Sequence, residues 1–189
     1  MFRNIFTQLY SLVFRPAETW KKMADNGEAA HSLFFSRFLF PIMGMVALSC
    51  FVDLIGEEFK AETIERVLKI SIIEFVKFFI SFYLIVFLWK QFSPQLSLPH
   101  DKEVIERFVG NLLALYMAVE IIVNILPRGF SFLSYASLGL VYIVWTGASS
   151  FLHIDESRKR LFSLAVTILI LMTPIVIARI FYMIMPLSY

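Results

Sequence analysis

Residues 161–185 read LFSLAVTILILMTPIVIARIFYMIM, a stretch in which Arg179 is the only charged side chain. A helix needs about 20 consecutive apolar residues to cross the roughly 30 Å hydrocarbon core of a bilayer. A basic run, residues 158–160, precedes the stretch directly. The stretch therefore predicts a membrane-spanning helix. Pro174 inside it is tolerated, because neighbouring helices can satisfy the backbone groups that a proline frees.

The composition of the whole chain agrees with this prediction. Of its 189 residues, 59% are hydrophobic and 17% are charged, whereas soluble domains have roughly 45–50% and about 25%. Domains of this size bury only about two-thirds of their surface, so the excess of apolar side chains has to face lipid. This excludes a soluble enzyme. The single cysteine, Cys50, excludes a disulfide-built secreted module, and a net charge of +2 is too small for a nucleic-acid binder.

Hydrophobicity divides the chain into five spans of this kind. The charged residues of the second span each oppose insertion by up to about 3 kcal/mol at mid-depth, but without that span its many apolar residues would be stranded in water. The predicted fold class is all-α: a polytopic integral membrane protein with five transmembrane helices in residues 33–189. The expected spans are Leu33–Ile55, Leu68–Phe92, Phe108–Leu126, a span from the turn Pro127-Arg128-Gly129 to Leu152, and Leu161–Met185.

Residues 1–32 are the least hydrophobic long stretch and are predicted to form a cytoplasmic interfacial segment. In residues 2–13 the apolar side chains recur every three or four positions, which is typical of an amphipathic helix in the membrane interface. A secretory signal peptide is the alternative, but polar residues interrupt the apolar run and no small-residue cleavage site follows. A second short helix is expected from Pro16, with Trp20 as an interfacial anchor.

The basic residues predict the orientation, because short cytoplasmic loops are enriched in lysine and arginine. Such residues gather in the N-terminal segment, between spans two and three, and in residues 158–160. With five spans, these three places fall on one side of the membrane. The loops on the other side hold few basic residues, and residues 186–189 are uncharged. The N-terminus is therefore predicted to be cytoplasmic and the C-terminus outside.

Two short motifs carry a family resemblance. Phe14-Arg15-Pro16-Ala17-Glu18-Thr19-Trp20 precedes the first span, and Tyr142-Ile143-Val144-Trp145-Thr146-Gly147 lies in the fourth, before a basic loop and a last span with Pro174. In this order the chain resembles the YIP domain family, named after Ypt/Rab-interacting members in eukaryotes. The resemblance implies five spans and a cytoplasmic N-terminus, with a link to small prenylated GTPases in eukaryotes. The Pro/Gly-rich leader of eukaryotic members is not seen here, which favours the prokaryotic branch and a bacterial inner membrane.

Polar side chains inside the spans are the main candidates for a functional site. At 1.5 Å per helical residue, Glu74 and Lys77 lie roughly 9–14 Å from the outer end of their span, and Glu120 and Arg179 about 9 Å from theirs. Lone charges facing lipid are costly, so we expect these groups to turn inward and Glu120 to pair with Lys77 or Arg179. The predicted intramembrane polar cluster is Asp53, Glu74, Lys77, Glu120, Asn124 and Arg179.

The sequence leaves two interpretations of this cluster open. It is either a polar cavity that serves a proton, an ion or a lipid head group, or an ion-pair network that only fixes helix packing. A transport path has to cross the whole membrane. The inner halves of spans two to five offer mainly hydroxyl groups, so the sequence indicates no relay that continues across.

Span four places Tyr135, Gly139, Ile143 and Gly147 on one stripe, four residues apart. Glycines at this spacing let another backbone approach closely, so the stripe is predicted to be a helix-packing seam, with a substrate groove as the alternative. No nucleophile elbow, phosphate loop or dinucleotide fingerprint occurs. We therefore predict no catalytic residue, no enzyme activity and no cofactor. The three histidines lack a paired metal-ligand pattern, so no metal site is predicted.

Three functional hypotheses follow. The first is a membrane scaffold or partner-binding protein, as the family resemblance implies, acting through the basic cytoplasmic face and span four. The second is a small transporter or channel subunit that uses the polar cluster. The third is a lipid-handling or membrane-shaping protein that uses the N-terminal helix and the phenylalanine-rich spans. The expected partners are the lipid bilayer and a protein at the basic face, without nucleic acid; a homo-oligomer stays open.

Overall fold

A computed structural model describes residues 2–25, 33–55, 60–96 and 101–186, and in these ranges all regular secondary structure is helical. Five segments are long and apolar enough to cross a membrane, so the prediction of an all-α polytopic membrane protein is confirmed. They are Phe35–Leu54, Ala61–Ser93, Lys102–Ile125, Gly129–Ser150 and Glu156–Ile184. The helices are α1 (Phe2–Phe14), α2 (Pro16–Asp25), η2 (Phe35–Leu39), α3 (Phe40–Ser49), η3 (Cys50–Leu54), α4 (Ala61–Leu96), α5 (Lys102–Ile125), η4 (Arg128–Gly139), α6 (Leu140–Ser150) and α7 (Glu156–Ile184).

The first span is built from three kinds of helix. It opens with a π-helical turn, η2, closed by a bond from the Phe40 backbone N–H to the Phe35 carbonyl, and it ends in the 3-10 helix η3. Pro41 follows the π turn directly. A proline ring in an α-helix clashes with the carbonyl four residues earlier, here that of Arg37, and the wider π turn relieves this contact.

The other four spans also differ from the predicted helices at their beginnings: α5 begins at Lys102 rather than Phe108, and α7 at Glu156 rather than Leu161. α4 begins at Ala61 rather than Leu68, and the ion pair between Lys69 Nζ and Glu65 Oε1 at 2.7 Å supports the added turns. Span four begins as the 3-10 helix η4 rather than as an α-helix. In η4, Ser134 and Ser137 each donate to the carbonyl three residues earlier. These local bonds compete with α-helical pairing.

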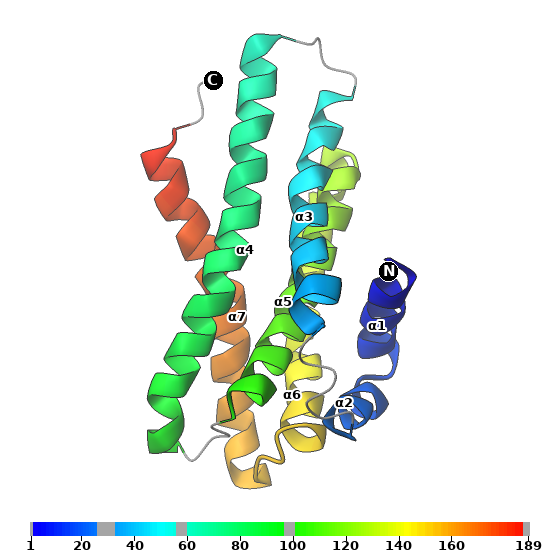
Figure 1. Ribbon diagram of the computed structural model, residues 1–189, viewed down its shortest axis with the longest axis vertical. Helices are drawn as coiled ribbons and strands as arrows, with labels where there is room; N and C mark the ends of the chain where they lie inside the picture. The colour runs from blue at the N-terminus through cyan, green and yellow to red at the C-terminus, as the bar shows by residue number, and fades with distance from the viewer. Residues whose placement is uncertain (1, 26–32, 56–59, 97–100, 187–189) are drawn as a thin grey trace.

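The helix ends divide the bundle into a basic end and an opposite end. Figure 1 shows α2, the end of α4, the beginning of α5, the end of α6 and the beginning of α7 at the same end of the molecule, which we call the basic end. The beginning of α4 and the end of α7 lie at the other. This arrangement is the one that the loop-charge pattern requires. Which of the two ends faces the cytoplasm stays a prediction.

The N-terminal segment docks on the bundle. α1 stands alongside the bundle with its axis along the spans (Figure 1), and it buries Ile5, Leu9 and Leu12 against protein. The Gln8 Nε2 donates to Asn111 Oδ1 on α5 at 2.7 Å. Part of the apolar face that the sequence assigned to the membrane interface therefore contacts the protein itself, while Phe6 on that face remains exposed.

Trp20 is the centre of this docking. It is 0% exposed, and its Nε1 donates to the Ile143 carbonyl at 3.1 Å. The expectation that Trp20 anchors the segment in the lipid interface is thus wrong. The physical reason is Gly147: a Cβ at that position would lie 2.6 Å from the Phe108 ring and 2.9 Å from the indole, so only glycine leaves room for Trp20.

The indole is part of a larger group of rings that holds the basic half of the bundle together. Neighbouring ring centroids lie between 5.0 and 6.5 Å apart, mostly tilted or edge to face, as aromatic pairs prefer. They come from α2, α4, α5, the end of α6 and α7, so this one cluster ties the N-terminal segment to four spans. We call Trp20, Trp89, Phe108, Phe151 and Phe162 the aromatic cluster.

We predict that Gly147→Ala destabilises the protein by about 1–3 kcal/mol, because overpacking a filled site costs roughly this much. Gly139→Ala is the matched control: it lies in the same span, and a Cβ there meets no atom within 4 Å. The control should be neutral or slightly stabilising. Thermal unfolding of both variants in detergent measures the difference, and equal melting temperatures would contradict the tight contact with Trp20.

The orientation gives a second prediction. A reporter fused after residue 189 should read as extracytoplasmic, and a reporter inserted at residues 158–160 should read as cytoplasmic, because the basic loops stay inside. Paired alkaline phosphatase and fluorescent protein fusions in a bacterial host measure both positions. Finding both reporters on the same side would remove the last span.

Candidate functional site

A charged pocket lies between α4, α5 and α7, in the half of the bundle away from the basic end. Its cavity volume is about 330 Å³. It brings together four of the six residues of the predicted polar cluster, from three different spans. Its lining consists of Glu74, Lys77, Tyr116, Glu120, Ile175, Ala178, Arg179 and Tyr182. We call this site the charged pocket.

Lys77 is the hub of the ion pairs in the charged pocket. Its Nζ lies 2.6 Å from Glu74 Oε1 on the same helix and 4.0 Å from Glu120 Oε1 on α5. The Lys77 and Glu74 side chains are 8% and 10% exposed, and the Glu120 side chain is 23% exposed. The expected contact between Glu120 and Lys77 is therefore confirmed, but Glu74 is the closer partner. The Lys77 ammonium also lies 4.9 Å from the centre of the Phe78 ring.

Two polar groups of the charged pocket are left without a protein partner in the part of the chain that the structure describes. Glu74 Oε2 is buried and accepts no hydrogen bond there. The guanidinium of Arg179 on α7 forms no ion pair with a described residue, so the alternative pairing of Glu120 with Arg179 is not seen. Buried polar groups are normally satisfied, so Glu74 Oε2 gives the charged pocket unused capacity to hold a polar guest, with the exposed Arg179 beside it.

Two residues of the predicted cluster lie elsewhere. Asn124 donates from Nδ2 to Ser49 Oγ at 2.9 Å and lies 3.7 Å from the Cys50 sulfur, so it joins α5 to the first span. Asp53 is exposed near the end of η3, and it does not line the charged pocket. Its position follows from the 3-10 helix, because three residues per turn place it on a different face from that of an α-helix.

Sequence reasoning missed the two tyrosines of the charged pocket. Tyr116 precedes Glu120 by one helical turn, and both line the charged pocket. Tyr182 follows Arg179 by three residues. Helical spacing from an intramembrane charge, i±3 or i±4, is the signal that could have found both.

Pro174 shapes the charged pocket. The α7 residues that line it, from Ile175 to Tyr182, all follow Pro174, which sits inside the helix. Proline removes one backbone bond and bends a helix. Figure 1 shows α4 and α7 crossing near mid-height, with the C-terminal half of α7 leading away from α4. The charged pocket lies between α4, α5 and the part of α7 that follows Pro174.

Between the charged pocket and the basic end, most of the described core is apolar; the buried Asn111 of α5 bonds to Gln8 of α1, away from α4 and α7. On α4, Phe82 and Ile85 are 1% and 0% exposed, and on α5 residues 112–114 are 0% exposed. Two buried hydroxyls of this region donate to their own helices, Ser81 to the Lys77 carbonyl and Thr167 to the Ser163 carbonyl, and the buried Ser163 hydroxyl has no hydrogen-bond partner among the described residues. These hydroxyls therefore form no relay between the helices, and no continuous polar path crosses the described residues.

The predicted packing seam on span four is only half as long as expected. Ile143 and Gly147 are buried and contact Trp20, but Tyr135 is 72% exposed and the space beside Gly139 is open. The reason is the 3-10 helix η4, whose three residues per turn rotate Tyr135 off the stripe.

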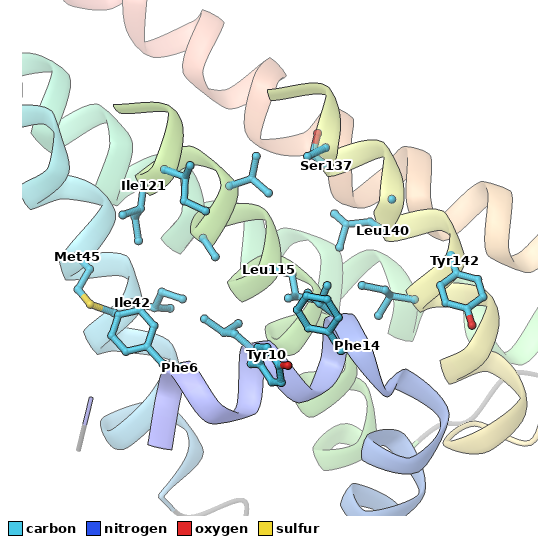
Figure 2. Close-up of a pocket in the computed structure, with 18 residues that line it drawn as sticks. Phe6, Tyr10, Phe14, Ile42, Met45, Leu115, Ile121, Ser137, Leu140 and Tyr142 are labelled. Atoms are coloured by element: carbon cyan, nitrogen blue, oxygen red, sulfur yellow. The ribbon is translucent and has the colours of Figure 1, made fainter. Parts of the chain in front are cut away.

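The open space beside Gly139 belongs to an apolar groove of about 710 Å³ between α1, α3, α5, η4 and α6. Figure 2 shows Phe6, Tyr10 and Phe14 of α1 on one side of this groove, with Leu115 of α5 and Leu140 and Tyr142 of α6 around it. Gly139 and Ile143 also line it. Its almost wholly apolar lining suits hydrocarbon rather than charge chemistry.

The histidines add no site among the described residues. His153 is exposed, with a positive φ of 53°, and no group of three metal-ligating side chains occurs in the described ranges. His31 and His100 lie outside those ranges.

The ion-pair geometry predicts a hierarchy of stabilities. Glu74→Gln removes the partner of a buried lysine and should cost about 3–5 kcal/mol of unfolding free energy. Glu120→Gln breaks a longer, more exposed contact and should cost about 1 kcal/mol or less. Double-mutant cycles with Lys77→Met, measured by unfolding in detergent, should give the larger coupling for Glu74. A larger coupling for Glu120 would reverse the assignment of the lysine's main partner.

No protein-family model, no curated protein and no solved structure matches this chain. The YIP domain resemblance therefore stays a prediction from the motifs alone. What the molecule does has to be argued from its own fold and from the charged pocket.

Proposed function

We propose that this membrane protein is a non-enzymatic binding protein that holds a small polar ligand in the charged pocket. The observation that carries the proposal is the unused polar capacity of the charged pocket, above all the buried Glu74 Oε2 without a partner. Ionisable groups inside a membrane are costly and usually mark ligand or ion sites. A network that served packing alone would be expected to satisfy its own carboxylate oxygens.

The same geometry favours binding over conduction. The charged pocket is open where Arg179 and Ile175 are exposed, and it is closed toward the basic end by buried apolar side chains. A transporter needs access from both sides, by a continuous path or by movement of one half against the other. In the conformation described, a ligand would therefore enter and leave beside Arg179 and Ile175 and not through the basic half of the bundle.

A membrane scaffold is the second candidate, and one observation favours it. Trp20 locks α2 to the basic end, so the exposed Lys21 and Lys22 are presented by a docked helix. A fixed cationic face suits an acidic protein partner or anionic lipid. This role needs the basic end to be cytoplasmic, so the two-reporter experiment above tests its premise.

Access of water to the charged pocket tests the binding proposal. In a Cys50→Ala background, Ala178→Cys places a thiol in the lining, and Ile170→Cys places one eight residues earlier on α7, where the native side chain is 0% exposed. A water-soluble maleimide reacts with the thiolate, which needs water to form. In proteoliposomes, Ala178→Cys should react at least about tenfold faster than Ile170→Cys.

The two other outcomes decide between the alternatives. Slow reaction at both positions would mean a dry ion-pair network, and the binding proposal would fail. Fast reaction at both positions would mean that water reaches past the apolar core, and conduction would replace binding.

A further inference from the structure

The charged pocket is balanced in formal charge. Its two carboxylates, Glu74 and Glu120, are matched by the cations of Lys77 and Arg179. A guest with net charge would leave one charge uncompensated inside a membrane-spanning helix bundle, which is unfavourable. The charged pocket therefore selects for a guest that is neutral overall but strongly polar.

The unused groups of the charged pocket have opposite signs and lie on different helices. Glu74 Oε2 on α4 is a buried acceptor without a hydrogen bond from any described residue. Arg179 on α7 carries donors that no described carboxylate takes up in an ion pair. Lys77 is different, because Glu74 Oε1 already engages it at 2.6 Å. A guest thus meets a carboxylate oxygen from one helix and a guanidinium from another.

On the basis of the proposed binding function, we propose that the charged pocket takes a zwitterion, with an ammonium group on Glu74 and a phosphate or carboxylate on Arg179. An ammonium supplies the N–H donors that Glu74 Oε2 lacks, and charge-assisted bonds of this kind are the strong ones. A guanidinium pairs with phosphate or carboxylate through two parallel bonds. The volume of about 330 Å³ greatly exceeds the roughly 30 Å³ of one water. The charged pocket therefore has room for an ammonium group together with a phosphate or carboxylate.

The outer face of α7 favours a lipid as the source of this zwitterion. Exposed apolar residues follow one another every three or four positions along the helix, and Arg179 continues the same face at its upper end. A phospholipid whose ethanolamine phosphate head enters the charged pocket would lay its chains along the half of this stripe nearest Arg179, from Ile175 to Ile168, because one leaflet covers only about half of the roughly 30 Å core. The stripe consists of Leu161, Leu164, Ile168, Met172 and Ile175.

Calorimetric titration of the full chain in detergent tests the proposal with three probes. They are dioctanoyl phosphatidylethanolamine, the anionic dioctanoyl phosphatidylglycerol, and chain-free glycerophosphoethanolamine. The ethanolamine lipid should bind at least about tenfold more tightly than the glycerol lipid, and Arg179→Gln and Glu74→Gln should each weaken it about tenfold or more. Arg160→Gln and Glu62→Gln, exposed residues outside the charged pocket, are the matched controls and should bind as the parent does.

Arg179→Gln leaves the Glu74–Lys77 pair intact, so it reports on binding even where Glu74→Gln unfolds the chain. Equal affinity for the two lipids, with both weakened by Arg179→Gln, would overturn the proposal that the guest is a zwitterion, but the proposed binding function would stand. Equal affinity for the ethanolamine lipid and the chain-free probe would support the zwitterion and assign its source to a free solute. If no probe binds, or if the pocket variants bind every probe as the parent does, the proposal of a zwitterionic guest is overturned. The cysteine labelling then decides separately whether the charged pocket is accessible.

Discussion

Hydrocarbon supplies no hydrogen-bond partner and little screening, and the arrangement of this bundle follows from that constraint. The backbone meets it by being helical in every span that the structure describes. The side chains meet it by pairing across short distances, as Lys77 does with Glu74 and Glu120. Where pairing is incomplete, at Glu74 Oε2 and Arg179, the molecule keeps a cavity. The incomplete pairing and the cavity are two aspects of one feature, and the proposed binding function depends on both.

The two halves of the bundle solve the packing problem differently. In the basic half, the aromatic cluster fills the interior and leaves no room even for a methyl group at Gly147. In the other half, α7 continues past Pro174, and charged side chains of α4, α5 and α7 line a cavity. The tightly packed basic half holds the charged groups of α4, α5 and α7 in place, while the charged pocket stays open. This division suits a binding site better than it suits a pore.

The sequence predicts the spans well because hydrophobicity over about 20 residues is a direct physical requirement of the bilayer. It also predicts the gathering of Glu74, Lys77 and Glu120, because buried charges need partners. It fails at Trp20, since a tryptophan near a membrane suits both an interfacial anchor and a buried hydrogen-bond donor, and only the distant Gly147 decides between them. It fails also at Tyr135, because nothing local to that stretch distinguishes a 3-10 start from an α-helical one.

The bond between Trp20 and the Ile143 carbonyl also sets an order of events during synthesis. The two residues are 123 positions apart in the chain. Ribosomes add about 5–20 residues per second, so roughly 6–25 s pass between the emergence of the tryptophan and that of its acceptor. Throughout that interval the surface on which α1 and α2 dock is incomplete. The membrane surface or the insertion machinery has to keep their apolar side chains out of water. The first part of the protein to be made is thus among the last to reach its final place.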